Sequence, residues 1–480
     1  MTNEAGSFDL SPDELRRLGH ETVEIMLEAI ASERVDPVYR KPSGAELMNL
    51  FNEPLPEEGC GPDEVIQQWR TDVLPYCRRN GHPRFFAYVC TSADPVGMLA
   101  DAVASALNQP VTAWRSSPAT TTVERQVLQW LDELTGFSAG GSGAMTSGGS
   151  MANFQSLACA VHGAELRSGL PSGSRHRMVI YLSTEGHVSL KKAARVLGIP
   201  DDQVRLIGID RNRRMRVEDL RRQIQTDRRL GLVPVAVCAS AGTANTGAID
   251  PLRELGSLCR TEEIWFHVDG SYGAPAVLTE EFAWMKEGFQ EADSLSLDPH
   301  KWLFAPVDAG CMLVREDEIL RSAFSIDSEY TTVVETDPIE RFAYFDRGLE
   351  MSRRFRALKV WSILKARGVA NIRRVVQHNI KLRYRLDELI DAREQLEPLG
   401  SELSISCFRY VPGRETDLSR ADHINETIVN RLVEDGRFYL SPTVLDGKYS
   451  LRVCIVNFRT TEQDIIDLVD EIVLIGDSIE

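Results

Sequence analysis

The sequence predicts an α/β fold: a largely parallel sheet covered by helices on both faces, followed by a small α+β domain. Its 480 residues exceed what one simple core can organise and indicate two or three domains. Hydrophobic residues at 43% and charged residues at 26% are typical of a globular chain. Between Phe86 and Val314, short β-branched runs alternate with helical stretches, as in sheets built from strand–helix–strand units.

The first ninety residues are predicted to be helical. Ser11-Pro12-Asp13-Glu14 has the pattern of a capping box with proline at the first helical position. Apolar or small residues then follow at helical spacing: Leu15, Leu18, Thr22, Ile25 and Ala29. Five prolines between Pro37 and Pro62 break the rest into short pieces. Such a segment would bury little apolar surface alone, so we expect it to pack against another surface, such as a second copy of the chain.

Five strands are predicted in the central region, together with two of the helices between them. The strands are 178–182, 204–207, 233–238, 264–268 and 310–314, and the helices are 217–230 and 252–259. Ligands of parallel sheets bind beyond the carboxyl ends of the strands. Asp269 falls at such an end.

The last part of the chain has a different texture. Residues 315–350 are polar and weakly periodic, which predicts a long functional or mobile loop. After a helix near 355–366, strands are expected at 403–410 and 449–456, with two amphipathic helices. We therefore predict a helical N-terminal segment (1–90), a large α/β domain (91–370) and a small α+β domain (371–480).

Asp269 and Lys301 have the arrangement that an enzyme needs to hold pyridoxal phosphate. The lysine amine can form a Schiff base with the cofactor aldehyde, and the carboxylate can keep the pyridine nitrogen protonated. An acid that ends an apolar strand needs a partner. We expect His300 and Trp302 to lower the pKa of Lys301. An acid in this position is more often functional than structural, and the alternative for Lys301 is an ordinary exposed lysine.

A glycine turn precedes a predicted helix at Thr146–Asn153. Gly148, Gly149 and Ser150 would present free backbone N–H groups at the helix N-terminus, where a phosphate is favoured. A flexible glycine–serine hinge is the alternative. His187 and Thr243 follow other strands at the same sheet edge, where an imidazole could stack on a planar cofactor and a hydroxyl could bond its edge. A surface histidine and ordinary turn chemistry are the alternatives.

Composition excludes several classes of protein. The net charge of −17 argues against a nucleic-acid or anionic-membrane partner. No apolar run approaches the roughly 18 residues of a membrane helix, and the N-terminus lacks the features of a secretory signal. Nine scattered cysteines without a CxxC pair predict reduced thiols in a cytoplasmic protein and no zinc site.

Several motifs together resemble the group II pyridoxal-dependent decarboxylases, and most closely their aromatic branch. The resemblance covers about residues 10–475 and is carried by the Thr146–Asn153 turn, His187 and five further motifs: His82–Tyr88, Trp114–Pro118, His267–Gly273, Asp298–Trp302 and Ser352–Trp361. It implies the aspartate-aminotransferase (type I) fold with a mostly parallel seven-stranded sheet. It also implies a homodimer with the site at the subunit interface and the N-terminal helices wrapped over the partner.

The resemblance assigns a role to individual residues. It implies cofactor contacts at Gly148, Gly149, Ser150, His187, Thr243, Asp269, Ser271 and Lys301. It places His300 beside the catalytic lysine and Tyr330 where a mobile loop carries a tyrosine that returns a proton to the substrate carbon. Substrate contacts are implied at Tyr88, Val89, Trp114 and Arg452, the last as the arginine that holds the α-carboxylate. The chain departs from the family pattern at Ala244 and Asp298, and near the substrate at Val89, Cys90 and Thr112.

We therefore predict a pyridoxal-phosphate enzyme that decarboxylates an L-amino acid, aromatic by the resemblance, to its amine. A decarboxylase of an acidic amino acid such as glutamate is one alternative. Another is an oxidative aldehyde synthase, in which the loop tyrosine is typically phenylalanine or the stacking histidine is asparagine. A transaminase or C–S lyase and a non-catalytic scaffold are further alternatives.

Overall fold

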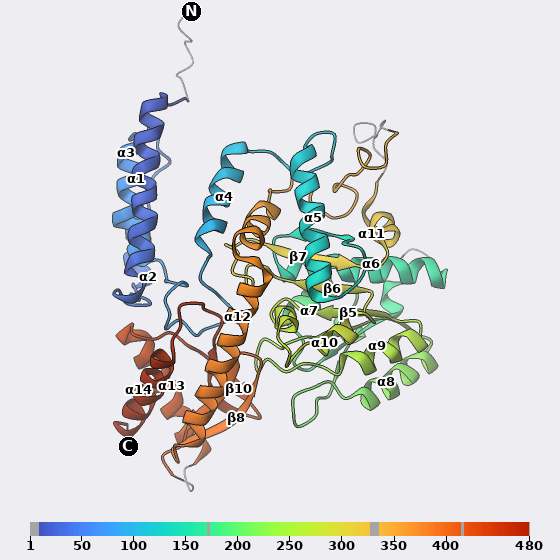
Figure 1. Ribbon diagram of the computed structural model, residues 1–480. Coiled ribbons are helices and arrows are strands. Elements are labelled where there is room, and N and C mark those ends of the chain that lie inside the picture. Colours follow the sequence, from blue (N-terminus) through green and yellow to red (C-terminus); the bar gives the residue numbers. More distant parts are fainter. Residues whose placement is uncertain (1–8, 170–172, 327–335, 414–416, 480) are drawn as a thin grey trace, which may run out of the picture.

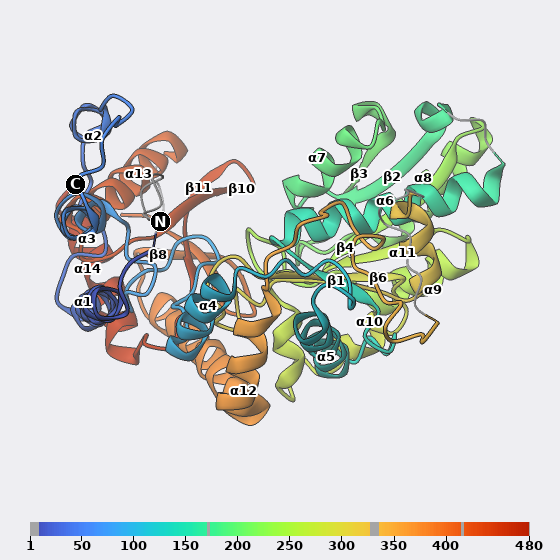
Figure 2. The same ribbon diagram turned by 90° about the horizontal axis from the view of Figure 1, so that it is seen from above.

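The computed structural model describes residues 9–169, 173–326, 336–413 and 417–479. Figure 1 shows the N-terminal helices standing beside a large body built on one sheet, with the C-terminal helices below them. Viewed from above, α12 (Ala357–Asp391) and α4 (Pro95–Leu107) lie between the N- and C-terminal parts and the large sheet (Figure 2).

The large sheet has seven strands in the order β1-β7-β6-β5-β4-β2-β3. Their bounds are β1 Gly143–Thr146, β2 Met178–Ser183, β3 Val204–Ile207, β4 Val233–Ser240, β5 Trp265–Asp269, β6 Ser294–Leu297 and β7 Gly310–Val314. Strands β3, β2, β4, β5 and β6 are parallel neighbours, and β7 is antiparallel to both β6 and β1. The mostly parallel seven-stranded sheet is confirmed, although the sequence patterns did not reveal β1 and β6.

The sheet is buried on both faces because its strands carry apolar side chains toward both helix layers. In β2, Val179 and Tyr181 belong to one core, whereas Met178, Ile180 and Leu182 belong to the other. The first core is covered by α5 (Pro118–Thr135), α8 (Val217–Arg229) and α9 (Leu252–Thr261). The second is covered by α6 (Gly149–Ser168), α7 (Val188–Val196) and α11 (Asp317–Phe324).

Helix α11 corrects one expectation. It lies in the segment that we predicted to be a long loop, and Leu320 anchors it in the second core. Only one face of this eight-residue helix is buried, so its apolar residues are few and the surrounding polar residues masked the helical pattern. Two short elements, η6 (Ala274–Leu278) and α10 (Met285–Phe289), lie between β5 and β6.

The C-terminal part is a four-stranded antiparallel sheet in the order β10-β11-β9-β8. Its elements are β8 Leu396–Glu402, β9 Ile405–Tyr410, α13 Leu418–Asp435, β10 Ser441–Leu445, β11 Lys448–Cys454 and α14 Glu462–Asp477. The helix expected at 355–366 forms the first part of α12, and a second part, beyond the non-helical Gly368, runs on to Asp391 and packs Leu382 and Leu386 into this second unit. Gly368, with φ 70°, kinks α12 two residues before the predicted boundary at 370. That boundary remains a prediction.

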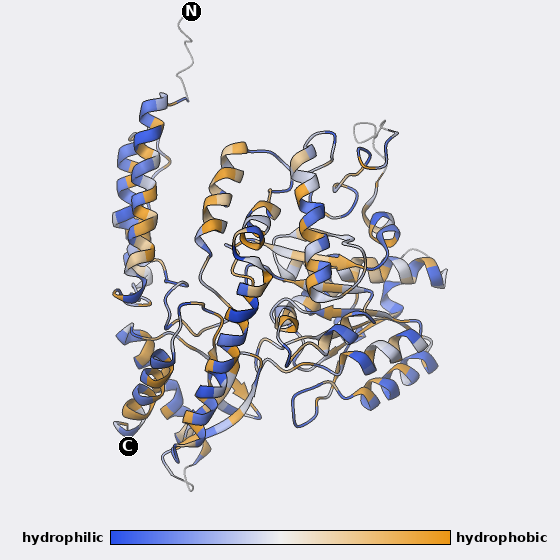
Figure 3. Cartoon of the chain, in the orientation of Figure 1, coloured by the Kyte–Doolittle hydropathy of each residue, from blue (hydrophilic) through white to orange (hydrophobic). Residues whose placement is uncertain are grey.

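The N-terminal helices are α1 (Pro12–Ala31), α2 (Gly44–Phe51) and α3 (Pro62–Gln68). Ser11 accepts a hydrogen bond from Glu14 N–H at 3.2 Å, which forms one half of the predicted capping box. A complete box starts α2 instead, between Ser43 and Glu46. A small apolar cluster of Leu18, Ile25 and Ile66 packs α1 against α3, and Arg17 on α1 forms an ion pair with Asp63 on α3. Figure 3 shows further apolar positions along these helices. None of the helices described is long and apolar enough to cross a membrane.

Candidate active site

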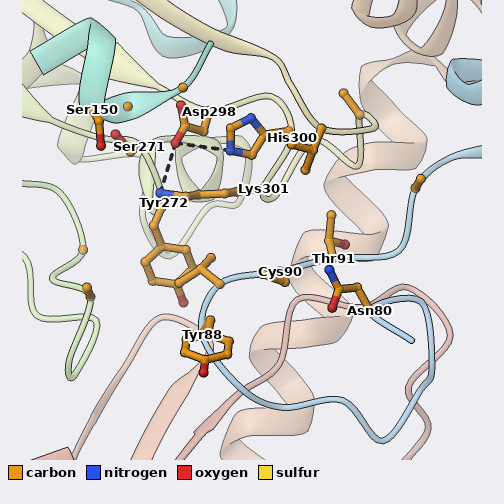
Figure 4. Close-up of a pocket in the computed structure, with 18 of the residues that line it drawn as sticks. Asn80, Tyr88, Cys90, Thr91, Ser150, Ser271, Tyr272, Asp298, His300 and Lys301 are labelled. Carbon is orange, nitrogen blue, oxygen red and sulfur yellow. Dashed lines mark ion pairs between the residues drawn. The ribbon is translucent and has the colours of Figure 1, made fainter. Parts of the chain in front are cut away.

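A cavity of about 950 Å³ opens where the carboxyl ends of the large-sheet strands face the small sheet. Residues that follow β1, β2, β4, β5 and β6 line one side, and residues from the loop before α4 and from the small sheet line the other. Figure 4 shows Ser150, Ser271, Asp298, His300 and Lys301 gathered at one end, with Tyr88, Cys90, Thr91 and Asn80 beyond them. The structure thus brings together residues that are far apart in sequence.

The glycine turn lies at the N-terminus of α6, as predicted. Gly148 is the N-cap residue with φ 151°, a conformation that glycine adopts without strain. A Cβ at Gly149 would lie 2.3 Å from Ser271 Oγ, so only glycine fits against β5 there. The N–H groups of Gly149 and Ser150 have no hydrogen-bond partner among the described residues. They are free to bind an anion.

Asp269 ends β5 at the bottom of the cavity and is only 7% exposed. Its Oδ1 accepts from Ser271 N–H at 3.1 Å and from Ser296 Oγ–H at 3.2 Å. Its Oδ2 accepts from Asn153 Nδ2 at 2.9 Å. Burial favours the neutral acid, but the hydrogen bond from Ser271 and the charge of Lys301 outweigh it and hold the Asp269 pKa below its ordinary value. The carboxylate therefore stays ionised.

Lys301 follows β6, and its Nζ lies 3.0 Å from Asp298 Oδ2 (Figure 4). Our prediction of a lowered Lys301 pKa was wrong for the chain without cofactor. Burial does lower the pKa, but the negative charges of Asp298 and Asp269 raise it above its ordinary value. The Trp302 ring is fully buried and stacks on Tyr272.

Two histidines line the same cavity. His187 caps α7 just beyond the end of β2, and its Nδ1 lies 2.7 Å from Ser189 Oγ. His300 accepts from Ala309 N–H through Nδ1 at 3.1 Å, and its Nε2 lies 3.6 Å from Asp298 Oδ2. Burial lowers the pKa of His300, although the charge of Asp298 opposes the shift.

The hydroxyl groups of Thr243 and Ser271, both predicted to contact the cofactor, have different hydrogen-bond partners. Thr243 lines the cavity, but its Oγ1 accepts from Ala248 N–H at 3.1 Å and lies 3.2 Å from Thr246 Oγ1. The turn chemistry considered from the sequence is thus present. Ser271 Oγ lies beside the glycine turn and 3.3 Å from Ser296 Oγ.

Comparison with known proteins identifies the family. The family described as "Pyridoxal-dependent decarboxylase conserved domain" matches residues 44–411. This chain belongs to that family. It is 35% identical to an aromatic-L-amino-acid decarboxylase of Bacillus atrophaeus, over 98% of both chains. It is 30% identical to a phenylacetaldehyde synthase of Petunia hybrida, over 93% of this chain and 91% of that one.

A solved structure, Oryza sativa TDC with PLP and tryptamine, superposes with a TM-score of 0.93 at 26% identity and covers 98% of this chain and all of that one. The aspartate-aminotransferase-like (type I) fold expected from the sequence is thereby confirmed. The decarboxylase is a pyridoxal-phosphate-dependent carboxy-lyase that acts on an amino acid.

The residues present fit pyridoxal phosphate. The free N–H groups at the start of α6 match a phosphate, and the ionised Asp269 matches a protonated pyridine nitrogen. Asp298 Oδ1 is buried and has no hydrogen-bond partner among the described residues, which leaves an acceptor beside the lysine. Such an unpaired oxygen is costly unless a bound group completes it.

The expected substrate residues are only partly brought together. Tyr88, Val89 and Arg452 line the cavity of the decarboxylase, whereas Trp114 lies outside its lining, in the loop before α5. Arg452 is 4% exposed and donates from Nε to Ala244 O at 2.9 Å and from Nη1 to Tyr88 O at 3.0 Å. Tyr330 lies outside the described residues.

Sequence reasoning missed three polar residues that hold the site from below: Asn153, Ser189 and His267. All are at most 4% exposed, and Asn153 bonds Asp269 directly. One signal was available for Asn153, because it follows Gly149 by one helical turn and so faces the sheet. The sequence also did not reveal Glu33 and Arg459, which line the far end of the cavity with an N–O distance of 2.8 Å.

Proposed function

We propose that this decarboxylase converts an aromatic L-amino acid into its amine and carbon dioxide. The observation that carries the proposal is the group of apolar side chains that line the cavity, Val89, Cys90 and Met98, together with the far end of the cavity, where Arg459 is already paired with Glu33. An aromatic side chain gains from such a lining, whereas a second carboxylate would lose its hydration there. The 35% identity to an aromatic-L-amino-acid decarboxylase supports the same substrate class.

Each residue of the site would have its own role in holding the cofactor. Bound pyridoxal phosphate supplies an electron sink for the pair released when the carboxylate leaves. Gly148, Gly149 and Ser150 would hold its phosphate, Asp269 its ring nitrogen and Lys301 its aldehyde carbon. His187 would lie against the ring.

Arg452 and Tyr330 are our proposed partners of the substrate. Nε and Nη1 of Arg452 donate to backbone carbonyls and to Ser441 Oγ, so a substrate carboxylate would meet the charge of the guanidinium and its Nη2 group. Tyr330 stays our proposed proton donor to the substrate carbon, and His300 a proposed catalytic neighbour of Lys301.

We also propose a homodimer in the cytoplasm, with segments 1–90, 91–370 and 371–480 as its domains. Exposed apolar residues on the N-terminal helices support the dimer: Leu15, Val23, Leu27, Met48 and Phe51. All nine cysteines are free, which suits a reducing compartment. Deleting residues 1–80 should leave aggregated or inactive protein, and a soluble, active monomer would contradict the proposal.

The deciding experiment measures carbon dioxide release from tryptophan, tyrosine, phenylalanine and DOPA against histidine, glutamate and aspartate. We expect kcat/KM to favour an aromatic substrate over glutamate by at least about a hundredfold, the scale of leaving a charge unpaired in an apolar pocket. A Val89→Arg variant should lose the aromatic activity, whereas Val188→Arg, at an exposed position outside the cavity lining, should not. Preference for glutamate would overturn the substrate class.

An oxidative aldehyde synthase is the second candidate, because a phenylacetaldehyde synthase shares 30% identity with this chain. Tyr330 and His187 favour amine formation, since aldehyde synthases typically replace one of them. The amine and hydrogen peroxide should therefore be measured together. We expect amine without peroxide from the wild type, and peroxide with aldehyde from Tyr330→Phe. Peroxide in amounts equal to carbon dioxide from the wild type would favour the synthase.

A further inference from the structure

A continuous network of side-chain hydrogen bonds runs beneath the cavity, from the core of the sheet, where its members are buried, to His187, which is exposed. Its members come from β5, β6, α6 and α7, and are Trp265, Ser294, His267, Asn153, Asp269, Ser189 and His187. Asn153 is the branch point. Its Nδ2 lies 2.9 Å from Asp269 Oδ2 and 3.0 Å from Ser189 Oγ, and its Oδ1 lies 3.0 Å from His267 Nε2.

The chemistry of these groups sets the direction of every bond. The ionised Asp269 can only accept, so the amide nitrogen of Asn153 must face it. The amide oxygen then faces His267, whose Nε2 must carry a proton. Burial lowers the pKa of His267 to about 4, so the ring is neutral and its Nδ1 is an acceptor.

The hydrogen bonds at the Trp265 end of the network have donors and acceptors that fit this direction. Ser294 Oγ lies 2.9 Å from both His267 Nδ1 and Trp265 Nε1. An indole N–H can only donate, so Ser294 accepts from Trp265 and is free to donate its own proton to His267. The reverse direction would set two acceptors against each other at Asn153.

The other branch sets the protonation of His187. Ser189 Oγ accepts from Asn153, so its O–H is free to donate to His187 Nδ1 at 2.7 Å. The backbone N–H of Ser189 points at the same Nδ1, at 3.3 Å. With two donors on Nδ1, the proton of a neutral His187 ring belongs on Nε2. His187 would then offer an N–H donor to the cavity that it lines.

We infer that Asn153 is a positioning residue that couples Asp269 and His187. Its single amide orients the Asp269 carboxylate and, by orienting the Ser189 hydroxyl, adds to the backbone N–H of Ser189 in favouring the Nε2–H form of His187. The inference rests on the roles proposed above for Asp269 and His187. Asn153 and Ser189 are 1% and 4% exposed, and His267 is fully buried, so water cannot replace a lost partner. The loss of one bond should therefore reach both sides of the cofactor site.

The first test reads the two ring protons directly in the protein without cofactor or substrate. Nitrogen NMR of histidine-labelled protein should show Nε2–H rings at both His187 and His267. In Ser189→Ala the backbone N–H of residue 189 is the remaining donor to His187 Nδ1, so the Nδ1–H form should rise from undetectable to a measurable fraction while His267 is unchanged. Ser189→Thr should restore the wild-type ring. A wild-type His187 that carries its proton on Nδ1, or one unaffected by Ser189→Ala, would overturn the inference.

The second test separates positioning from packing. Asn153→Leu removes the branch point, and Asn425→Leu removes an equally buried amide that bonds Tyr410 and Ala421 in the small domain. Asn153→Leu should lower kcat by about tenfold to a hundredfold, the scale of one lost hydrogen bond to a charged group. It should also weaken pyridoxal phosphate binding to the cofactor-free protein and shift the acid limb of kcat to higher pH, because Asp269 loses a donor while its burial remains.

Asn425→Leu should change none of these beyond a lower melting temperature. Superimposable pH profiles and cofactor affinities for the two leucine variants would show that Asn153 only fills space. If Asn153→Leu fails to fold, the NMR comparison of Ser189→Ala with Ser189→Thr still tests the inference. If the NMR result holds but no aromatic amine is formed, the proposed substrate fails and the positioning role stands.

Discussion

Two regions of this decarboxylase differ in which side chains they bury: one buries polar groups, and the other leaves apolar groups exposed. At the bottom of the cavity, polar groups such as Asp269, Asn153 and His267 are buried, and each bonds a neighbour in the same chain. Along the N-terminal segment that contains α1 to α3, apolar side chains such as Leu27 and Leu55 are 53% and 93% exposed. The first region is complete within one chain, whereas the second leaves its apolar surface uncovered.

This difference indicates that the buried polar groups serve the chemistry of the site and that the exposed apolar groups serve assembly. Buried polar groups are tolerated at the strand ends because a rigid sheet brings their hydrogen-bond partners to fixed positions around one carboxylate. Exposed apolar side chains that gather on one set of helices are typical of a surface that binds another chain. Perturbing the first region should therefore change rates and pH dependence, and perturbing the second should change assembly.

The largest effect is expected at Lys301. Lys301→Ala removes the amine that bonds the cofactor, so turnover should fall by at least about a thousandfold, the scale of removing a catalytic nucleophile. Weak cofactor binding should persist through the glycine turn. Borohydride reduction of the wild type followed by peptide mapping should label Lys301.

Lys359 provides the matched control. It is also buried, at 1% exposed, but pairs with Asp101, and neither of the two residues lines the cavity. Lys359→Ala should keep the label on Lys301. A label on any other lysine in the wild type would reject the assignment.

Next in size is Asp269. Asp269→Ala should reduce kcat by at least about a hundredfold, the scale of losing one strong electrostatic contact in a closed site. Asp269→Asn keeps much of the hydrogen bonding but not the charge. We expect it to be nearly as slow, as measured by steady-state decarboxylation. Near-normal turnover of the asparagine variant would show that hydrogen bonding, rather than charge, is what the site needs.

The N-terminal face should respond differently. Leu15, Val23 and Leu27 lie at helical spacing on α1, and all are more than 40% exposed. If a second copy covers them, Leu27→Glu loses roughly 1.5–3 kcal/mol of burial and weakens dimerisation by about tenfold to a hundredfold. Analytical ultracentrifugation measures the shift. Leu474→Glu on α14, 65% exposed, is the control and should leave assembly unchanged. Equal behaviour of the two variants would argue that α1 faces solvent.

From the sequence, some features of these regions could be predicted and others could not. Asp269 and Lys301 were found because a strand end and a lysine motif are local signals. Strand β6 was missed because Ser294 and Ser296 interrupt its apolar pattern, and the fold shows why they are polar: they donate to His267 and Asp269. The Lys301 pKa was predicted in the wrong direction because chain neighbours were considered instead of Asp298, which a turn brings to 3.0 Å.

The smallest expected effect tests that correction. Asp298→Asn removes the charge next to Lys301 while keeping the shape of the side chain. Burial then outweighs the remaining attraction to Asp269 and lowers the Lys301 pKa. Imine formation needs the free amine, and the fraction of free amine grows about tenfold each time the Lys301 pKa falls by one. The rate of pyridoxal phosphate uptake by the cofactor-free protein should therefore reach its plateau at a lower pH.

The midpoint of that pH–rate curve is the measurement, because it is insensitive to any change in phosphate affinity. Asp293→Asn, which replaces a buried acid that accepts from Phe266 N–H at the opposite end of β5, should leave the midpoint unchanged. A midpoint that stays fixed in Asp298→Asn would mean that Asp269 alone raises the Lys301 pKa, and that Asp298 contributes to the site only as a hydrogen-bond acceptor.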